Sequence, residues 1–343
     1  MLGNLKLYSD HLAIDLGTDN TLLYVKDRGI VINEPSAIAV GLNGEPHQRI
    51  LAVGSEAKSM LGKTPEHIRV IHPLRDGAID NIEAACLMLK HFIKTARKSR
   101  KLARVHAVIA VPSGITQIEM AAVVETAESA GAHRVFLIEG TVAAALGAGL
   151  PVTEPVCSMV VDIGSGTTEV AVISLAGIVS SKSIKVAGNR MNAAIKNFIK
   201  RQYNLLIGDS WSEKIKIELG NACPDPQNQV TLKVKGRDLT SGIPKIIPID
   251  SVEILEAISE QIGSIVQIIR STLEEIPPEL SADVLERGIL LTGGGAMLKN
   301  IDRLFGKEIG LPTTIPEDPQ STVVLGAAKV IDNMSDLSRF MLK

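Results

Sequence analysis

The stretch that decides the fold reads VVDIGSGTTEVAV and spans residues 160–172. An apolar, strand-like run carries Asp162, breaks into glycines and threonines, and then resumes as an apolar strand. A carboxylate is costly to bury in a strand unless something pairs with it. A second stretch, LAIDLGTDNTLLYV at 12–25, has the same pattern around Asp15. Two copies of one unusual feature call for a single explanation.

The two copies predict an internal duplication. Asp162 follows Asp15 by 147 positions, close to half of a chain of 343 residues. In each half, strands come first and helices follow. Each glycine turn joins two strands and does not open a helix, which differs from a Rossmann dinucleotide-binding unit. We therefore expect an α/β protein built as two related lobes.

Other segments complete this pattern. The stretch RGILLTGGGAMLKN at 287–300 predicts a buried strand, a turn of three glycines and then a helix. The longest helix is predicted from Ser251 to about Glu275, with Asp250 as its cap and Glu253 placed to reach back. Pro277 and Pro278 are expected to end it.

The glycine turns predict a phosphate site. Glycine lets a ligand approach the backbone closely, and successive backbone N–H groups in such turns form an anion nest. The three turns are Gly17–Thr18, Gly164–Gly166 and Gly293–Gly295, and the side-chain donors beside them are Thr18, Asn20, Ser165, Thr167 and Thr168. Three unrelated tight turns are the alternative, which the matched D-[LI]-G-[TS] hairpins disfavour. Two such hairpins, one from each half, can hold a polyphosphate between them.

The aspartates then have an explanation. Asp15 and Asp162 would point at the phosphates, where direct contact is repulsive. A magnesium ion keeps several waters and prefers carboxylate and phosphate oxygens, so one ion between these groups removes the conflict. We therefore predict Asp15 and Asp162 as metal ligands.

Composition excludes several other classes. A net charge of −2 and an aromatic content of 3% argue against a nucleic-acid partner. Cys86, Cys157 and Cys223 are widely spaced and form no CxxC, which favours a reducing cytoplasm. The sequence has neither an apolar run of spanning length nor the apolar segment of a secretory signal.

The motifs resemble those of the actin, sugar-kinase and heat-shock-chaperone ATPase superfamily, and within it those of MreB, the bacterial actin-like cell-shape family. The resemblance runs from about residue 10 to 331. The stretches that carry it are DLGTDNTLLYVKDRGIVINEPS, VVDIGSGTTEVAVISLAGIV, YNLLIGDSWSEKIKIELGNA, GRDLTSGIPK and ERGILLTGGGAMLKNIDRLF.

This resemblance implies an actin-like bilobed fold around a nucleotide cleft. The first lobe would take residues 10–145 and 315–343, with a small subdomain at about 33–74. The second lobe would take 146–314, with a small subdomain at about 186–245.

The resemblance also implies residue roles for ATP and Mg²⁺. The first phosphate loop would contain Asp15, Gly17, Thr18, Asp19 and Asn20, and the second Gly164, Ser165, Gly166 and Thr167. The nucleoside would be contacted by Glu213, Lys214, Ile215 and Lys216 and covered by Gly293, Gly294, Gly295, Ala296 and Met297. Without the resemblance, the acid and the base at 213 and 216 would be read as an ordinary exposed helix face.

The chain departs from the family at one place that bears on hydrolysis. The family usually reads IEEPMAAA where this chain reads IEGTVAAA at 138–145. Gly140 therefore replaces the glutamate that the resemblance assigns to positioning the attacking water, and Thr141 replaces the proline. Glu139 and Thr167 are the remaining candidates for catalytic residues. We expect ATP binding with slow hydrolysis or a rearranged site.

A second departure lies at AGNRMNAAI, residues 187–195, where the family more often has acidic residues in place of Asn189, Arg190 and Asn192. Ser165 stands where glycine is common. Serine adds a phosphate donor, so we expect this change to be harmless.

Two segments suggest a membrane surface. The N-terminal residues Leu2, Leu5, Leu7 and Tyr8 are either a frayed strand or a short amphipathic foot. The run IKTARKSRKLAR at 93–104 contains Lys94, Arg97, Lys98, Arg100, Lys101 and Arg104 and no acid. It is either a solvated face or a contact with anionic lipid, worth about 1 kcal/mol per basic residue near the surface. The resemblance favours lipid contact.

The function implied by the resemblance is a nucleotide-dependent filament on the inner face of the cell membrane. It would be cytoplasmic and peripheral, and it would determine rod shape by organising membrane proteins of cell-wall synthesis. A non-hydrolysing scaffold that co-assembles with an active paralogue is an alternative. A chaperone ATPase would need a peptide-binding domain after the nucleotide domain. A sugar kinase would need a carboxylate base beside a polar pocket, for which no local motif is found.

Overall fold

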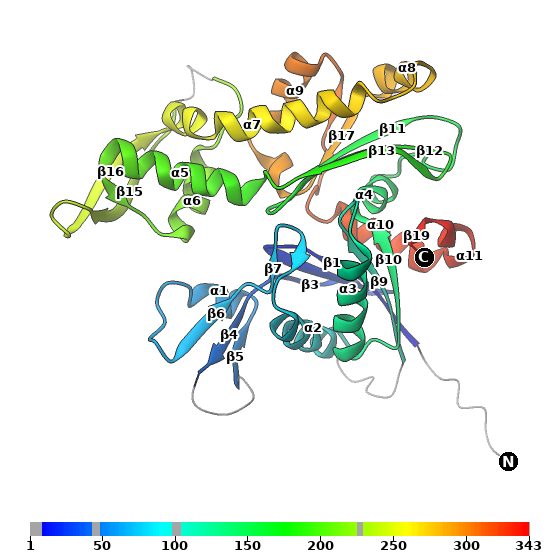
Figure 1. Cartoon of the computed structure of the whole chain (residues 1–343), viewed down its shortest axis with the longest axis horizontal. Helices are drawn as coiled ribbons and strands as arrows, with labels where there is room; N and C mark the ends of the chain where they lie inside the picture. Colours follow the sequence, from blue (N-terminus) through cyan, green and yellow to red (C-terminus); the bar gives the residue numbers. More distant parts are fainter. Residues whose placement is uncertain (1–8, 43–48, 98–103, 225–228, 343) are drawn as a thin grey trace. The chain divides into compact units, whose positions relative to one another are not determined.

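The computed structural model describes residues 9–42, 49–97, 104–224 and 229–342 (Figure 1). The chain forms two compact units. Unit 1 comprises the residues up to Glu154, Leu175–Gly177 and the residues from Ser321 onward. Unit 2 comprises Pro155–Ser174 and Ile178–Gln320. The predicted lobe and subdomain bounds stay predictions.

The main sheet of unit 1 has the strand order β19-β10-β9-β1-β2-β3. Its strands are β1 (Ser9–Leu16), β2 (Asn20–Val25), β3 (Gly29–Pro35), β9 (Arg104–Val111), β10 (Arg134–Glu139) and β19 (Met341–Leu342). β1, β9 and β10 run parallel, whereas β1, β2 and β3 form an antiparallel meander.

The main sheet of unit 2 repeats this design. Its order is β13-β12-β11-β17-β18, from β11 (Ser158–Ile163), β12 (Thr168–Ser174), β13 (Gly177–Ile184), β17 (Ile289–Thr292) and β18 (Thr313–Thr314). Here β11 pairs antiparallel with β12 and parallel with β17, and β17 pairs parallel with β18. This matches β3-β2-β1-β9-β10 strand for strand. The prediction of two related α/β halves is confirmed.

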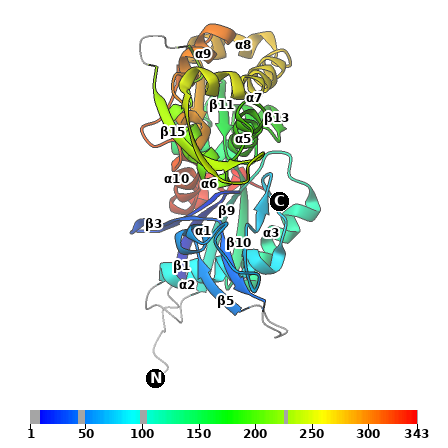
Figure 2. The same cartoon turned by 90° about the vertical axis from the view of Figure 1, so that its left-hand side faces the viewer.

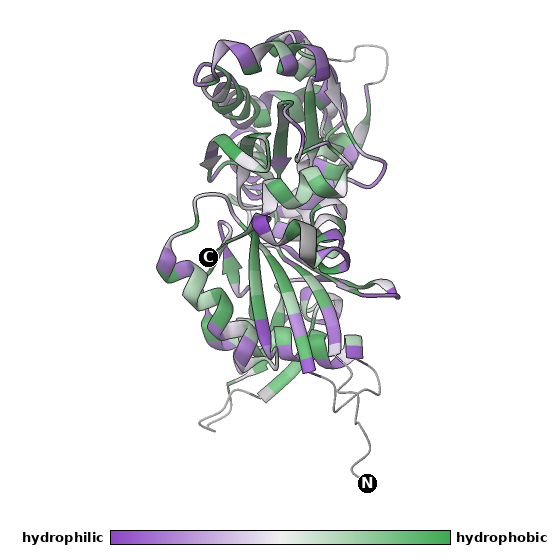
Figure 3. Cartoon of the chain, turned by 90° about the vertical axis from the view of Figure 1, so that its right-hand side faces the viewer, coloured by the Kyte–Doolittle hydropathy of each residue, from purple (hydrophilic) through white to green (hydrophobic). Residues whose placement is uncertain are grey.

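Helices cover the unit 1 sheet on both faces. Buried residues of α2 (Ile82–Arg97) and α3 (Gln117–Ser129) share a core with Leu12 and Ile14 of β1. The opposite face packs against α10 (Thr322–Asp332), which pairs with α4 (Gly140–Gly147). Hydrophobic colour runs along the strands of this sheet (Figure 3), as expected for a sheet covered on both sides.

Small residues let α4 and α10 approach closely. A Cβ atom added at Gly326 would lie 1.7 Å from the carbonyl oxygen of Ala143. One added at Gly147 would lie 1.9 Å from the carbonyl oxygen of Thr322. The Nζ atom of Lys329 donates to the carbonyl oxygen of Leu146 at 2.6 Å, which satisfies a terminal acceptor of α4.

A large core lies on one side of the unit 2 sheet. It joins the strands to α5 (Gly188–Tyr203), α7 (Ser251–Leu273) and α9 (Ile301–Ile309), and α5 packs beside α7 (Figure 1; Figure 2). Helix α7 begins as predicted, because Asp250 accepts from the N–H of Glu253 and the Glu253 carboxylate accepts from the N–H of Asp250. Its end agrees with the prediction within two residues: α7 stops at Leu273 with Glu274 as its cap residue, and Pro277 is the cap residue of the next helix, α8 (Pro278–Arg287).

Smaller elements complete each unit. In unit 1 they are β4 (Ile38–Gly41), β5 (Arg49–Val53), β6 (Ile68–Ile71), β7 (Leu74–Arg75), β8 (Ala78–Ile79), α1 (Ser55–Ser59), α11 (Met334–Leu337) and η2 (Ser338–Phe340). In unit 2 they are β14 (Leu205–Leu206), β15 (Thr231–Asp238), β16 (Pro244–Asp250), α6 (Asp209–Leu219) and η1 (Gly294–Met297).

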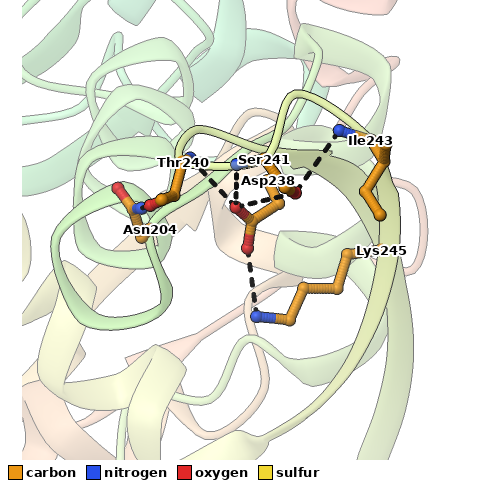
Figure 4. Close-up of polar contacts among 6 residues, drawn as sticks. All are labelled: Asn204, Asp238, Thr240, Ser241, Ile243 and Lys245. Atoms are coloured by element: carbon orange, nitrogen blue, oxygen red, sulfur yellow. Dashed lines mark hydrogen bonds and ion pairs between the residues drawn. The ribbon is translucent and has the colours of Figure 1, made fainter.

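Asp238 organises the tip of the β15–β16 hairpin, within the stretch GRDLTSGIPK (Figure 4). Its Oδ1 accepts from the backbone N–H groups of Thr240 and Ser241, each at 2.9 Å. Its Oδ2 pairs with Nζ of Lys245 at 3.2 Å. These bonds, the one to Ser241 foremost, lower the pKa of Asp238 to about 2. The turn is thus held by a carboxylate that stays charged.

Candidate functional site

The first predicted phosphate loop is the turn between β1 and β2. Leu16 pairs with Thr21, which leaves residues 17–20 in the turn, and Asp15 pairs with Leu22 on the strands. A Cβ atom at Gly17 would lie 2.5 Å from the carbonyl oxygen of Asn20, so only glycine fits this turn. Asp15 is therefore the penultimate residue of β1, just before a tight turn, as the sequence predicted.

Ser36, which directly follows β3, holds this loop, and the sequence analysis missed it. Its hydroxyl donates to the carbonyl oxygen of Gly17 at 2.6 Å, and its N–H donates to the carbonyl oxygen of Asp19 at 2.8 Å. The hydroxyl of Thr18 accepts from the N–H of Gly77 at 3.0 Å. The loop is thus shaped by contacts with segments distant in sequence.

The second predicted phosphate loop has the same register. Ile163 pairs with Thr168, which leaves residues 164–167 in the turn, and Asp162 pairs with Glu169. The N–H of Gly164 donates to the carbonyl oxygen of Thr167 at 2.9 Å. Thr168 was wrongly predicted as a donor beside this turn, because it is fully buried and its hydroxyl donates to the carbonyl oxygen of Val186 at 2.7 Å.

The third glycine turn packs on Asp162 inside unit 2. Gly293 has φ of +80°, and a Cβ atom there would lie 2.2 Å from Oδ1 of Asp162. A Cβ atom at Gly295 would lie 2.2 Å from the Ile163 side chain. Both positions therefore require glycine for close approach to the end of β11. The sequence-predicted residues Asp162 and Gly293–Gly295 come together in one place.

Burial raises the pKa of Asp162 to about 6, and no charged neighbour among the described residues contributes to this shift. A carboxylate in such a place is stabilised by a cation. No group of three or more His, Cys, Asp or Glu side chains in the described ranges is arranged to hold a metal ion. Magnesium needs only one or two carboxylates besides phosphate oxygens, so Asp162 fits this requirement.

The start of α5 adjoins the second loop. The N–H of Gly188 donates to the carbonyl oxygen of Gly164 at 3.2 Å, and the N–H of Asn189 donates to that of Ser165 at 2.8 Å. From α6, Nζ of Lys216 donates to the carbonyl oxygen of Gly188 at 3.1 Å. Helix N-termini and ammonium groups both favour anions. Gly188 is a further residue of this site that the sequence analysis did not single out.

The other α6 residues occupy different environments. The Ile215 side chain is fully buried in the unit 2 core, where it anchors the helix. Lys214 pairs with Glu218 at 3.6 Å and lies 5.1 Å from the ring centroid of Trp211. Glu213 and Lys216 are half-buried. In the third turn, Ala296 is buried, whereas Met297 is 62% exposed.

Glu139 and Gly140 lie where β10 ends and α4 begins. Glu139 is the cap residue of α4, and Gly140 is its first residue. Burial raises the pKa of the Glu139 carboxyl, while a hydrogen bond from Ser113 lowers it. A Cβ atom at Gly140 would meet only the carbonyl oxygen of Val111, at 3.5 Å, so a Cβ atom at this position is sterically allowed.

The predicted membrane segments are only partly described. Leu2, Leu5, Leu7 and Tyr8, and also Lys98, Arg100 and Lys101, lie outside the described residues. Arg97 pairs with Asp10 at 3.3 Å, while Lys94 and Arg104 are exposed. Within the described ranges, no helix combines the length and the apolar character needed to cross a membrane.

Comparison with known proteins agrees with this geometry. The family model described as MreB/Mbl protein matches residues 9–339. The chain belongs to the MreB/Mbl family. The cell shape-determining protein MreB of Escherichia coli strain K12 is 48% identical over 331 residues, which cover 95% of this chain and 94% of that protein. The cell shape-determining protein Mbl of Bacillus subtilis strain 168 is 43% identical over 333 residues, 97% of this chain and 99% of that protein.

Solved structures support the same family and its actin-like fold. MreB5 of Spiroplasma citri bound to ADP has a TM-score of 0.90 at 36% identity, covering 96% of this chain and 98% of that one. The same protein bound to AMPPNP has a TM-score of 0.89 at 37% identity, covering 96% and 97%. The MamK double helical filament, with a TM-score of 0.78 at 22% identity over 94% and 99%, supports the fold alone.

Proposed function

We propose that this MreB/Mbl family member binds ATP with Mg²⁺ and polymerises into filaments that help to determine cell shape. Its S. citri relative has been solved with ADP and with AMPPNP. Within this chain, one observation carries the proposal: two hairpins present an aspartate and a four-residue glycine turn in identical register. Folding of a hairpin does not require an aspartate at this position, so its presence in both hairpins indicates a shared binding role.

The residues divide the task of binding. Backbone N–H groups of the turns at 17–20 and 164–167 donate to phosphate oxygens, as in other anion nests, except that of Gly164, which closes its own turn onto Thr167. The α5 N-terminus and Lys216 add positive potential beside the second turn. Asp15 and Asp162 hold Mg²⁺, which supplies charge neutralisation of the phosphates. Glu213, Lys216 and the segment 293–297 contact the nucleoside.

Filament formation follows from nucleotide binding by population shift. A nucleotide that binds one conformation better favours that conformation. A head-to-tail contact that does not close into a ring makes a filament. The filament would lie on the inner face of the membrane in the cytoplasm, through the N-terminal residues and the basic run at 93–104, beside membrane proteins of cell-wall synthesis.

Hydrolysis is proposed to be slow. Gly140 offers no side chain to orient water, and positioned acids or bases contribute about 10²–10⁴-fold in rate. A scaffold that holds ATP and co-assembles with an active paralogue is the second candidate, favoured by the same Gly140.

The test measures phosphate release and ATP-dependent pelleting for the wild type, Gly140→Glu and Gly140→Gln. The glutamine variant matches the size of glutamate but lacks its charge. We expect all three to pellet with ATP, and only Gly140→Glu to release phosphate about tenfold or more faster. Brisk release by the wild type would contradict slow hydrolysis. Failure of the wild type to bind ATP would contradict the whole proposal.

A further inference from the structure

A buried chain of hydroxyl groups leads to Glu139 in unit 1. Ser113 follows β9, and its Oγ lies 2.9 Å from Oγ1 of Thr141 in the first turn of α4. Ser113 is 6% exposed and Thr141 is fully buried. Ser113 also makes a side-chain hydrogen bond to Glu139. Three polar side chains from two segments thus meet where Gly140 departs from the family.

The direction of this chain follows from the number of protons. A serine hydroxyl has one hydrogen, and an ionised carboxylate only accepts. Ser113 therefore donates to Glu139, and Thr141 must donate to Ser113. The Ser113 hydroxyl is then directed at the Glu139 carboxylate, and the Thr141 hydroxyl fixes that direction. A proline at 141 would have no hydroxyl to supply the first of these bonds.

The second oxygen of Glu139 is buried without a partner. Oε2 has no hydrogen-bond partner in the described part of the chain. An unsatisfied buried polar atom is destabilising, so a native protein keeps one only for a reason. Glu139 ends β10, which runs parallel to β9 and, through it, to β1. Parallel strands end at the same edge, so Glu139 shares the edge of the sheet with the loop after Asp15.

We propose that Ser113 and Thr141 position Glu139 to orient the attacking water, so that Glu139 supports the slow ATP hydrolysis of this chain. The inference rests on the proposed ATP binding. The Glu139 carboxylate accepts a hydrogen bond from the water. The water oxygen adds to the γ-phosphorus as the bond to the β–γ bridging oxygen breaks and ADP leaves with that electron pair. The water proton passes to the released phosphate or to solvent.

The kinetic test measures phosphate release against pH at saturating ATP for the wild type, Glu139→Gln, Ser113→Ala and Thr141→Val. Glu139 must be ionised to accept from water, so the wild-type rate falls on the acid side as Glu139 takes up a proton. Ser113→Ala removes a bond to the ionised carboxylate, and Thr141→Val removes the donor that orients Ser113 toward it. Both changes raise the pKa of Glu139 and move this acid limb to higher pH. Thr141→Ser keeps the hydroxyl and should leave the limb unmoved. Glu139→Gln should lose the limb and at least tenfold in rate.

A second readout needs no nucleotide. Because burial raises the folded pKa of Glu139, wild-type stability relative to Glu139→Gln should fall as pH rises from about 4 through the folded pKa, and then stay constant. The stability of Ser113→Ala relative to the double variant Ser113→Ala/Glu139→Gln should also fall with pH. This fall should continue to a higher pH than in the wild-type pair. Thermal unfolding across pH 4–8 measures both pairs.

The outcomes separate the two proposals. Absence of ATP binding, by titration with a fluorescent ATP analogue, would refute the proposed function. ATP binding with hydrolysis whose acid limb is identical in the wild type, Ser113→Ala and Thr141→Val would overturn the positioning role alone. Equal rates for the wild type and Glu139→Gln would also overturn it. A purely structural role would lower the unfolding temperature equally at every pH and leave the limb in place.

Discussion

Gly293 shows most directly how single residues tie the fold to the site. Its φ of +80° and the 2.2 Å that would separate an added Cβ atom from Oδ1 of Asp162 are independent reasons for glycine. The sequence identified this turn as glycine-rich but could not reveal that Asp162 lies against it, since the two are far apart along the chain. Local composition predicts a turn, whereas the partner of a turn depends on tertiary packing.

This residue yields a prediction. Gly293→Ala should lower the free energy of unfolding by more than about 1 kcal/mol, because alanine is strained at positive φ and its Cβ displaces Asp162. It should also weaken ATP binding through that displacement. Urea unfolding and ATP titration measure the two effects.

Gly294→Ala is the matched control, because its Cβ would meet only Nε2 of Gln320, at 3.4 Å. Equal unfolding free energies for the two variants would contradict the assigned role of Gly293.

Other residues show the same limit of sequence reasoning. Asp15 and Asp162 could be singled out because a charge interrupts an apolar strand. Ser36, Ser113 and Thr141 carry no comparable local signal, because a small hydroxyl fits loops and cores equally well. Thr168 was taken as a donor beside the turn, but the pleat turns it into the interior, where Val186 accepts its hydroxyl.

At the scale of elements, the hairpins and α7 could be predicted because their signals are local. Alternation marks the strands, glycine marks the turns, and the Asp250–Glu253 capping box marks the helix start. The end of α7 was predicted within two residues of where it lies. A proline sets only the furthest point that a helix can reach, and here the chain leaves the helix at Leu273 before it reaches Pro277.

Helix packing gives a second prediction, which compares the change from glycine to alanine at two helix positions. Gly326→Ala should destabilise unit 1 by about 1–3 kcal/mol, because the new methyl would lie 1.7 Å from the Ala143 carbonyl oxygen and separate α10 from α4. Gly263→Ala in α7 should stabilise unit 2 by about 0.5–1 kcal/mol, because nothing lies within 4 Å of its Cβ and alanine favours helix.

Thermal unfolding of each variant and of the wild type measures these changes in stability. A Gly326→Ala variant as stable as the wild type would show that α4 and α10 do not rely on small residues for their contact. A destabilised Gly263→Ala variant would contradict the prediction for α7.

At the scale of the whole molecule, the decisive feature is duplication. Two main sheets share one strand order and one set of directions, with the aspartate hairpin in the same place in each. The sequence indicated this through two motifs 147 positions apart, and the family match over residues 9–339 agrees with it. Strand order itself could not be derived from the motifs, because pairing between distant strands leaves no local pattern.

The measurement that tests the central claim most directly is sedimentation of the wild-type chain with Mg²⁺ and ATP, with Mg²⁺ and AMPPNP, and without nucleotide. If nucleotide drives assembly, the chain should pellet with ATP and with AMPPNP and remain in the supernatant without either. Asp162→Asn, which removes one proposed magnesium ligand, should require more ATP to pellet. Equal pelleting in all three conditions, or none in any, would contradict a nucleotide-dependent filament.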